Sequence, residues 1–355
     1  MWNSSRFFLL VPILVASGRD TGHPPMALMD LIIDPEGGAP SEFSYAPQAD
    51  RVAYRLDGTG ERAGLWILDR TDGGHRQVLP DVPAERYHVL SIAPDGAHLA
   101  YSRMTAGPAP RVLGLGVLAC ASGDRREMTG TSVAWTPRGD RVAVADGASP
   151  TITVIDLPSL ETRSILRTPC ACDPDGRPLL TWSPSGDRLA YVLHQPQVPI
   201  TSLWVVPADW QGQLAGGGDA RLVMADGEGC VSLVPFWSPD GRLAWRLTSA
   251  NDPSGSRHYV EEEGGEVREV GRGARLDPAG SPVWSPDGSR MVFTRTVGTA
   301  EASTTDLWEM IVATGDMRQL TDVGDAFGEV AWSPSGRTIY LQDGRQVRSV
   351  CVEEP

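Results

Sequence analysis

The stretch "VWSPDGSRMVF" at residues 283–293 decides the fold, because it places a tight turn between two apolar flanks. Pro286 fixes φ near the value needed at the second position of a turn, and Asp287 can bond its own backbone. Gly288 tolerates a left-handed conformation. The alternating apolar residues on either side are typical of short strands, so the stretch predicts a β-hairpin.

The same hairpin recurs along the whole chain. The first copy, at 44–54, carries Ala49 where the other copies carry glycine. A third strand such as "SLWVVP" (202–207) and a fourth such as "RLVMA" (221–225) follow each hairpin. Four short strands in about 40–50 residues are the period of a β-propeller blade. The prolines of the seven copies are Pro47, Pro94, Pro137, Pro184, Pro239, Pro286 and Pro334.

Five copies place a tryptophan before the turn, and repetition at one position per blade favours packing over ligand contact. These tryptophans are Trp135, Trp182, Trp237, Trp284 and Trp332. The last copy is followed by only one more strand, which leaves its blade one strand short. The apolar segment "ALMDLIID" at 27–34 is expected to supply the missing outer strand. The sequence therefore predicts an all-β chain with a single propeller over 27–355, with seven blades favoured over six or eight.

Composition excludes several classes of function. The 355-residue chain has a net charge of −14, which opposes binding to nucleic acid or to an anionic membrane. All 31 basic side chains are arginine, so Schiff-base and P-loop lysine chemistry are excluded. No histidine spacing or G-x-S-x-G elbow indicates a metal centre or a nucleophile. We expect no metal, no cofactor, no catalytic residue and a monomeric protein.

The N-terminus resembles a secretory signal. One arginine precedes the apolar run 7–16, and small residues follow it, so residues 1–18 are expected to be a signal peptide and 19–26 a linker. The run is too short to span a bilayer. The alternative is a cytoplasmic protein that starts at Met26. A disulfide from Cys230 to Cys170 or Cys172 is left open.

The repeat "WSPDG", followed by an "LW" strand and "RxLT", resembles the TolB-type propeller repeat. A similar repeat occurs in the propellers of prolyl oligopeptidase and dipeptidyl peptidase relatives. The resemblance covers 43–350 and is most specific at Trp237–Gly241 and Trp284–Gly288. It implies the fold strongly and the function weakly, since propellers carry many activities. No stretch matches the extra domains of either family, so no catalytic residue is carried over.

The sequence favours a non-enzymatic scaffold that binds a protein or peptide outside the cytoplasm. One alternative is a propeller lyase or hydrolase that acts on glycans, and another is a structural or sensor domain. The short turns of the repeats should cluster at one face, and longer loops such as 103–111, 194–202, 248–258 and 295–306 should lie at the other. Binding residues favour variable loops on a rigid scaffold.

We therefore predict a binding site on the loop-rich face. Replacing Arg257 and His258 together is expected to weaken binding without lowering the melting temperature. The predicted binding residues are His194, Gln195, Asn251, Arg257, His258 and Arg295.

Overall fold

The structure, a computed structural model, is built from antiparallel strands, and none of its described residues is helical. It describes residues 39–46, 48–57, 61–107, 110–130, 132–145, 151–157, 159–167, 180–195, 200–209, 220–226, 230–249, 256–262, 265–273, 282–299, 302–322, 330–333, 335–343 and 346–352. The predicted signal peptide (1–18), linker (19–26) and closing strand (27–34) lie outside this set, as do Cys170 and Cys172. Chain closure, blade count and the disulfide therefore stay predictions.

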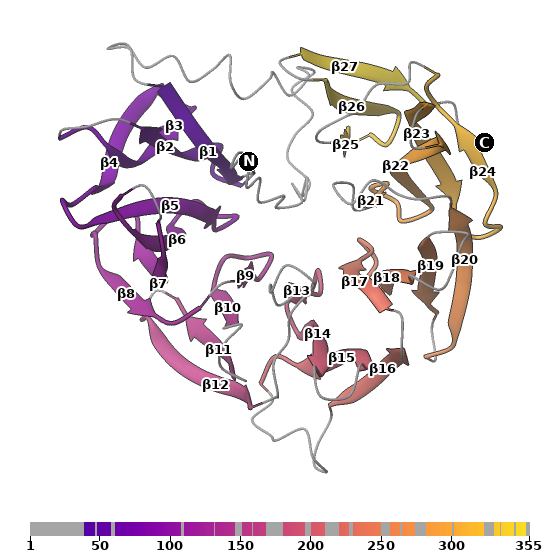
Figure 1. The fold of residues 1–355 in the computed structure, drawn as a ribbon, viewed down its shortest axis with the longest axis horizontal. Helices are drawn as coiled ribbons and strands as arrows, with labels where there is room; N and C mark the ends of the chain where they lie inside the picture. The colour runs from indigo at the N-terminus through magenta and orange to yellow at the C-terminus, as the bar shows by residue number, and fades with distance from the viewer. Residues whose placement is uncertain are drawn as a thin grey trace. The chain divides into compact units, whose positions relative to one another are not determined.

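Consecutive strands pair with one another, so each sheet is an up-and-down meander (Figure 1). The first four sheets are sheet 1 with β1 (Ala39–Ala46), β2 (Arg51–Asp57), β3 (Gly64–Asp69) and β4 (Gly74–Pro80); sheet 2 with β5 (Glu85–Ile92), β6 (His98–Thr105), β7 (Val112–Ala119) and β8 (Arg125–Met128); sheet 3 with β9 (Ser132–Trp135), β10 (Arg141–Ala145), β11 (Thr151–Asp156) and β12 (Glu161–Arg167); and sheet 4 with β13 (Leu180–Trp182), β14 (Arg188–Gln195), β15 (Ile200–Pro207) and β16 (Arg221–Asp226).

The last three sheets continue the pattern, and the final one has three strands among the described residues. They are sheet 5 with β17 (Cys230–Trp237), β18 (Leu243–Ser249), β19 (Ser256–Glu261) and β20 (Val267–Gly273); sheet 6 with β21 (Val283–Trp284), β22 (Arg290–Thr299), β23 (Ala302–Ile311) and β24 (Met317–Gln319); and sheet 7 with β25 (Val330–Trp332), β26 (Thr338–Asp343) and β27 (Gln346–Cys351). Sheets 1 and 2 form one compact unit, and sheets 3 to 7 form a second.

Neighbouring sheets within each unit pack through both of their faces. In sheet 2, Tyr87, Leu99 and Tyr101 join the side chains of sheet 1 in one apolar cluster. The second strand of a sheet carries an alanine between larger residues, because a small side chain lets the next sheet approach closely. Five of these alanines are fully buried: Ala53, Ala100, Ala143, Ala190 and Ala244. The apolar alternation of the repeats thus fills the spaces between sheets.

The turn between the first and second strands is tied to the next sheet by an arginine. Arg242 Nη2 donates to the Gly288 carbonyl at 2.9 Å, and its guanidinium lies 5.6 Å from the Trp284 ring centroid. Arg290 makes the same two contacts with Gly336 and Trp332, at 2.9 Å and 5.0 Å. Arg188 repeats the pattern one sheet earlier, with Gly241 and Trp237. We call this repeated contact the arginine clamp.

The tryptophans reach in the opposite direction, toward the preceding sheet. The indole N–H of Trp182 donates to the Ala134 carbonyl at 3.0 Å, and that of Trp237 donates to the Thr181 carbonyl at 3.1 Å. Trp332 donates to the Val283 carbonyl at 3.2 Å. Each of these indoles therefore ties its sheet to the one before it, which confirms a packing role for them.

The turn glycine is left-handed wherever the repeat carries it, with φ of 70° at Gly288 and 87° at Gly241. The first turn differs from the sequence alignment. Its left-handed residue is Asp50 (φ 50°), one position after Ala49. Aspartate tolerates this conformation better than most side chains. Ala49 is therefore aligned with the turn glycines in sequence but does not share their conformation.

Candidate functional site

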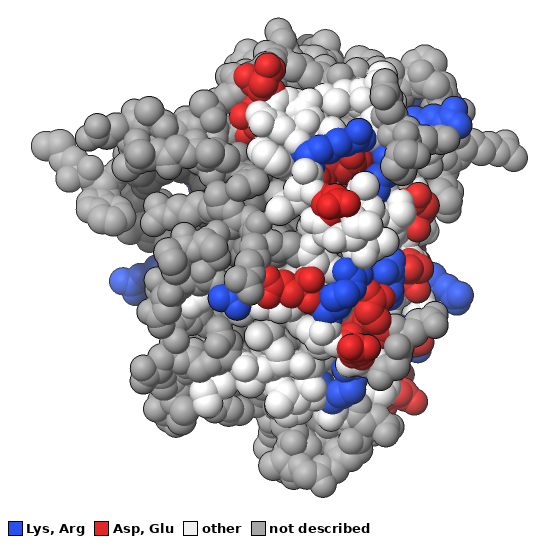
Figure 2. Space-filling model, turned by 90° about the vertical axis from the view of Figure 1, so that its right-hand side faces the viewer, with Lys and Arg blue, Asp and Glu red and all other residues white. Residues whose placement is uncertain are grey.

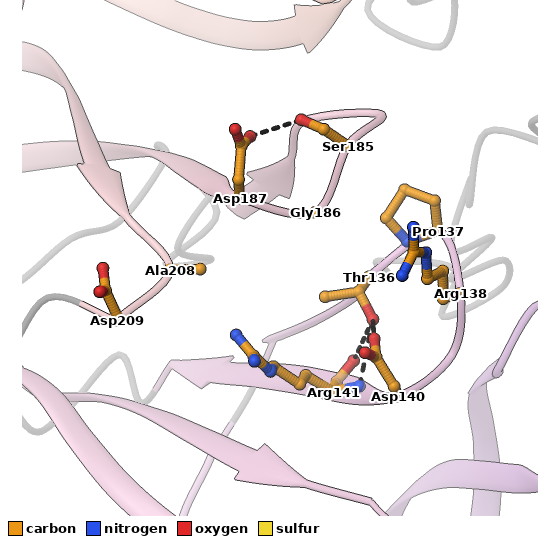
Figure 3. Close-up of a pocket in the computed structure, with 10 residues that line it drawn as sticks. All are labelled: Thr136, Pro137, Arg138, Asp140, Arg141, Ser185, Gly186, Asp187, Ala208 and Asp209. Carbon is orange, nitrogen blue, oxygen red and sulfur yellow. Dashed lines mark hydrogen bonds between the residues drawn. The ribbon is translucent and has the colours of Figure 1, made fainter.

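Each sheet has two ends, the turn end just described and the opposite end, which we call the loop end. At the turn ends of sheets 3 and 4 lies an open cleft of about 360 Å³ (Figure 3). Thr136 Oγ1 donates to Asp140 Oδ1 at 2.6 Å, and Ser183 Oγ donates to Asp187 Oδ1 at 2.8 Å. The Ser185 and Ser183 hydroxyls hold the pKa of Asp187 below its ordinary value. The carboxylates of Asp140 and Asp187 thus serve the turns themselves.

Charged side chains on the outer strands also form contacts between neighbouring sheets. Figure 2 shows arginine and acidic side chains interleaved on the side that lies to the right in Figure 1. Arg268 Nη2 contacts Glu262 Oε1 at 2.6 Å and donates to the Val312 carbonyl of sheet 6 at 2.9 Å. Arg221 of sheet 4 pairs with Glu261 of sheet 5. These contacts hold neighbouring sheets together.

The predicted binding residues lie mostly in strands rather than in loops. β22 and β23 stay paired from Arg290↔Ile311 to Thr299↔Ala302, so the expected loop at 295–306 is largely a hairpin. Its threonines and valine favour extended backbone, which explains the difference. Asn251 lies outside the described residues. The other five lie in β14 (His194, Gln195), β19 (Arg257, His258) and β22 (Arg295).

His258 is part of the packing between sheets 5 and 6. Its side chain is 1% exposed and stacks on Phe293, with ring centroids 5.4 Å apart. Neither ring nitrogen has a hydrogen-bond partner among the described groups. Burial, helped by the nearby Arg246 guanidinium, lowers the pKa of His258 to about 3. The imidazole is therefore neutral near pH 7 and faces another sheet rather than a partner.

Arg257 and His258 do not form one surface. They are consecutive in β19, and successive side chains of a strand point to opposite faces of the sheet. Replacing both with alanine would remove buried contacts of His258, so we now expect a lower melting temperature from the double change. The structure contradicts the premise behind the expected unchanged stability, because both residues lie in a strand and not in a loop.

A different group of residues forms an exposed surface at the loop end of sheet 2. Arg86, Met104 and Val112 are register partners across β5, β6 and β7, which lie side by side in Figure 1. The register shifts between Arg103 and Met104, so Leu113 is an extra residue in β7. A bulge re-aims side chains locally, and here both Val112 (57% exposed) and Leu113 (45%) face solvent.

Backbone contacts bring the neighbouring segments to the same place. The Ala106 N–H donates to the Ala84 carbonyl at 3.0 Å, and the Thr105 N–H donates to the Arg111 carbonyl at 2.9 Å. Val82 is 43% exposed and bridges to Glu85. We call the resulting surface the sheet 2 patch: Val82, Arg86, Arg111, Val112 and Leu113.

The carboxylates around the sheet 2 patch are already engaged. Arg103 binds Glu85 through two bonds of 2.9 and 3.0 Å and contacts Glu127 at 2.7 Å. The Arg103 hydrogen bonds hold the pKa of Glu85 below its ordinary value. Asp81 accepts bonds from Arg55 at 2.7 and 3.2 Å. Within the described part of the chain, no carboxylate pairs with Arg86 or Arg111.

The sequence predicted a variable loop at 103–111, and Arg103 at its start is held in ion pairs with Glu85 and Glu127. The pattern "PRVLG" at 110–114 was an available signal, because two large apolar residues directly follow an arginine and precede a glycine. Across the described residues, no group of three or more His, Cys, Asp and Glu side chains is placed to hold a metal ion.

Comparisons with known proteins support the fold. No family model matches the chain. A Bacillus subtilis protein named as an uncharacterized peptidase, YuxL, is 25% identical over 200 residues, which are 45% of this chain and 28% of that protein. The chain thus spans less than a third of that relative's length.

Two solved structures cover most of the chain. An oligogalacturonate lyase in complex with manganese has a TM-score of 0.54 at 14% identity, over 88% of this chain and 89% of that one. A chain of the mitotic checkpoint complex has a TM-score of 0.55 at 15% identity, over 98% and 100%. Together with the repeated antiparallel sheets, these neighbours confirm the predicted β-propeller class. Identities this low show the fold alone, so membership of the TolB-type repeat family stays a prediction.

Proposed function

We propose that this chain is a non-enzymatic β-propeller scaffold that binds a protein or peptide partner through the loop ends of its sheets, outside the cytoplasm. The observation that supports this proposal is the unequal use of the two ends. At the turn ends, arginines and tryptophans contact neighbouring sheets, as Arg290 contacts Trp332 and Gly336. The loop end of sheet 2 instead exposes apolar side chains beside Arg86 and Arg111, with which no carboxylate of the described residues pairs.

The environment of His258 bears on the alternative that the chain is an enzyme. A general base needs an accessible group that titrates near the working pH. His258, the candidate histidine whose side chain the structure describes, is buried and has a pKa of about 3. The oligogalacturonate lyase shares the fold at 14% identity, which carries no activity to this chain. Among the described candidates, binding fits the geometry better than catalysis.

Export is supported by the sequence pattern at residues 1–18. The described residues contain no helix that is long and apolar enough to cross a membrane. Cell fractionation with N-terminal sequencing of the mature chain tests the location. A mature protein that begins near residue 19 outside the cytoplasm supports export, and a cytoplasmic chain that begins at Met1 or Met26 contradicts it.

Position-specific photocrosslinking tests the binding function. A photoreactive amino acid replaces Pro110 at a loop end in one variant and Asp240 at a turn end in a matched variant; both residues are exposed. We expect discrete higher-mass adducts in the source cells from position 110 and none from position 240. Adducts from position 240 alone would contradict the proposal.

A further inference from the structure

The sheet 2 patch has a chemistry that selects its partner, and this inference rests on the proposed binding function. Its apolar part consists of Val82, Val112 and Leu113, which are 43%, 57% and 45% exposed. These three are among the most exposed large apolar side chains of the described residues. A gathering of exposed apolar groups within one surface marks an interaction site more often than isolated ones do.

The charged part of the patch is positive, in contrast to the chain as a whole. The net charge of the protein is −14, yet the side chains that flank the apolar groups are Arg86 and Arg111. Arg86 lies across β6 from Val112 through the register pairs Arg86↔Met104 and Met104↔Val112. Arg111 directly precedes Val112. Both arginines therefore lie next to Val112, Arg86 across the strands and Arg111 along the chain.

The nearby acids leave these two cations available. Glu85 and Glu127 are held by Arg103, and Asp81 is held by Arg55. An incoming carboxylate thus meets arginines whose charge is not already neutralised by a carboxylate of the described residues. Arginine binds carboxylates through two parallel bonds, which gives orientation as well as attraction. Complementary charge also steers the approach of a partner.

We propose that the sheet 2 patch binds an acidic, apolar segment of a protein partner. The apolar side chains of that segment cover Val112, Leu113 and Val82, while its carboxylates bind Arg86 and Arg111. Basic segments are repelled by the positive charge of the arginines. They also find no free carboxylate to bind in the described surroundings of the patch. The surface therefore selects by charge as well as by apolar contact.

Selection from a displayed library of random 12-residue peptides tests the inference on the full chain. Wild-type protein should enrich peptides that combine acidic and apolar residues. The variant Arg86→Glu/Arg111→Glu should enrich basic, apolar peptides instead, and it should bind the wild-type-selected peptides at least about tenfold more weakly. Val112→Ser/Leu113→Ser should lose both kinds of peptide.

Arg76→Glu is the matched control, because Arg76 is an exposed arginine on β4, away from the patch. It should bind the selected peptides like the wild type. All the changed side chains are exposed or border solvent, so unchanged unfolding midpoints check that the variants are folded. Selected peptides that bind the patch variants and the wild type equally would overturn the inference while leaving the proposed function standing. No enrichment over the bare support would contradict both.

Discussion

The arginine clamp at Arg290 should contribute more to the free energy of unfolding than the clamp at Arg242, although both make the same contacts with the next sheet. The difference lies in the carboxylate beside each arginine. Arg290 Nη1 contacts Glu309 Oε1 at 3.2 Å, and the Glu309 side chain is 1% exposed. Arg242 contacts Asp240 at 2.8 Å, and the Asp240 side chain is 49% exposed. Only Arg290 neutralises a buried charge.

The magnitudes follow from these environments. Removing one partner of a buried ion pair costs about 3–5 kcal/mol, because the other charge stays buried. Arg318 still contacts Glu309 at 2.5 Å, so we take the lower part of that range. Arg290→Met also loses the hydrogen bond to the Gly336 carbonyl and the contact with the Trp332 ring, and these losses add little to the cost of the broken ion pair. We expect Arg290→Met to lower the free energy of unfolding by about 3–4 kcal/mol.

Arg242→Met is the matched control and should cost about 1–2 kcal/mol. It loses the carbonyl bond and the ring contact, but its carboxylate partners Asp240 and Glu262 are 49% and 32% exposed and Glu262 keeps Arg268. Urea unfolding, followed by tryptophan fluorescence, measures the free energy of unfolding of both variants. Urea is uncharged, so it does not screen the ion pairs. Adding Glu309→Gln to Arg290→Met should restore part of the lost stability. Equal losses at the two clamps, or a further loss on adding Glu309→Gln, would refute the reasoning.

Three other changes test the turns, the closure and the buried histidine. Gly288→Val should cost about 1–3 kcal/mol in urea unfolding because a β-branched residue resists φ of 70°, whereas Ala49→Val should cost less because Ala49 is not left-handed; equal losses would contradict this. Deleting 1–35 should broaden or abolish the thermal transition, while deleting 1–25 should leave it unchanged, and identical melting curves would rule out 27–34 as the closing strand. Burial lowers the pKa of His258 from 6.5 to about 3, so between these values the unfolded chain binds a proton that the folded chain does not. Stability should therefore fall as the pH drops from about 6.5 toward 3, and His258→Phe should show a smaller fall; parallel pH profiles would contradict the assignment.

The repeated turns were predictable because their chemistry is local. Pro286 and Gly288 restrict the backbone conformation of the turn through their own chemistry, and Gly288 is left-handed in the structure. The packing role of Trp182 and Trp237 followed from repetition, and both donate to the preceding sheet. Local signals of this kind do not depend on how the sheets pack, so the fold class could be predicted from them.

The site was harder to predict because it depends on strand register. His258 looked like a loop residue, but β19 begins at Ser256, and the alternation along the strand then turns its imidazole toward Phe293. The exposure of Leu113 depends on a bulge between β6 and β7, which only the pairing of the two strands defines. Whether Arg86 is free depends on the ion pairs of other residues. None of these features is visible in a single segment of sequence.

The most direct test of the account is a hydrogen-exchange footprint on the full chain, recorded with and without the partner identified by crosslinking at position 110. The account predicts slower exchange at 82–86 and 104–113, with unchanged exchange in the turns that carry Gly241 and Gly288. Slower exchange confined to those turns would contradict the central claim that the loop ends bind and the turn ends hold the sheets together.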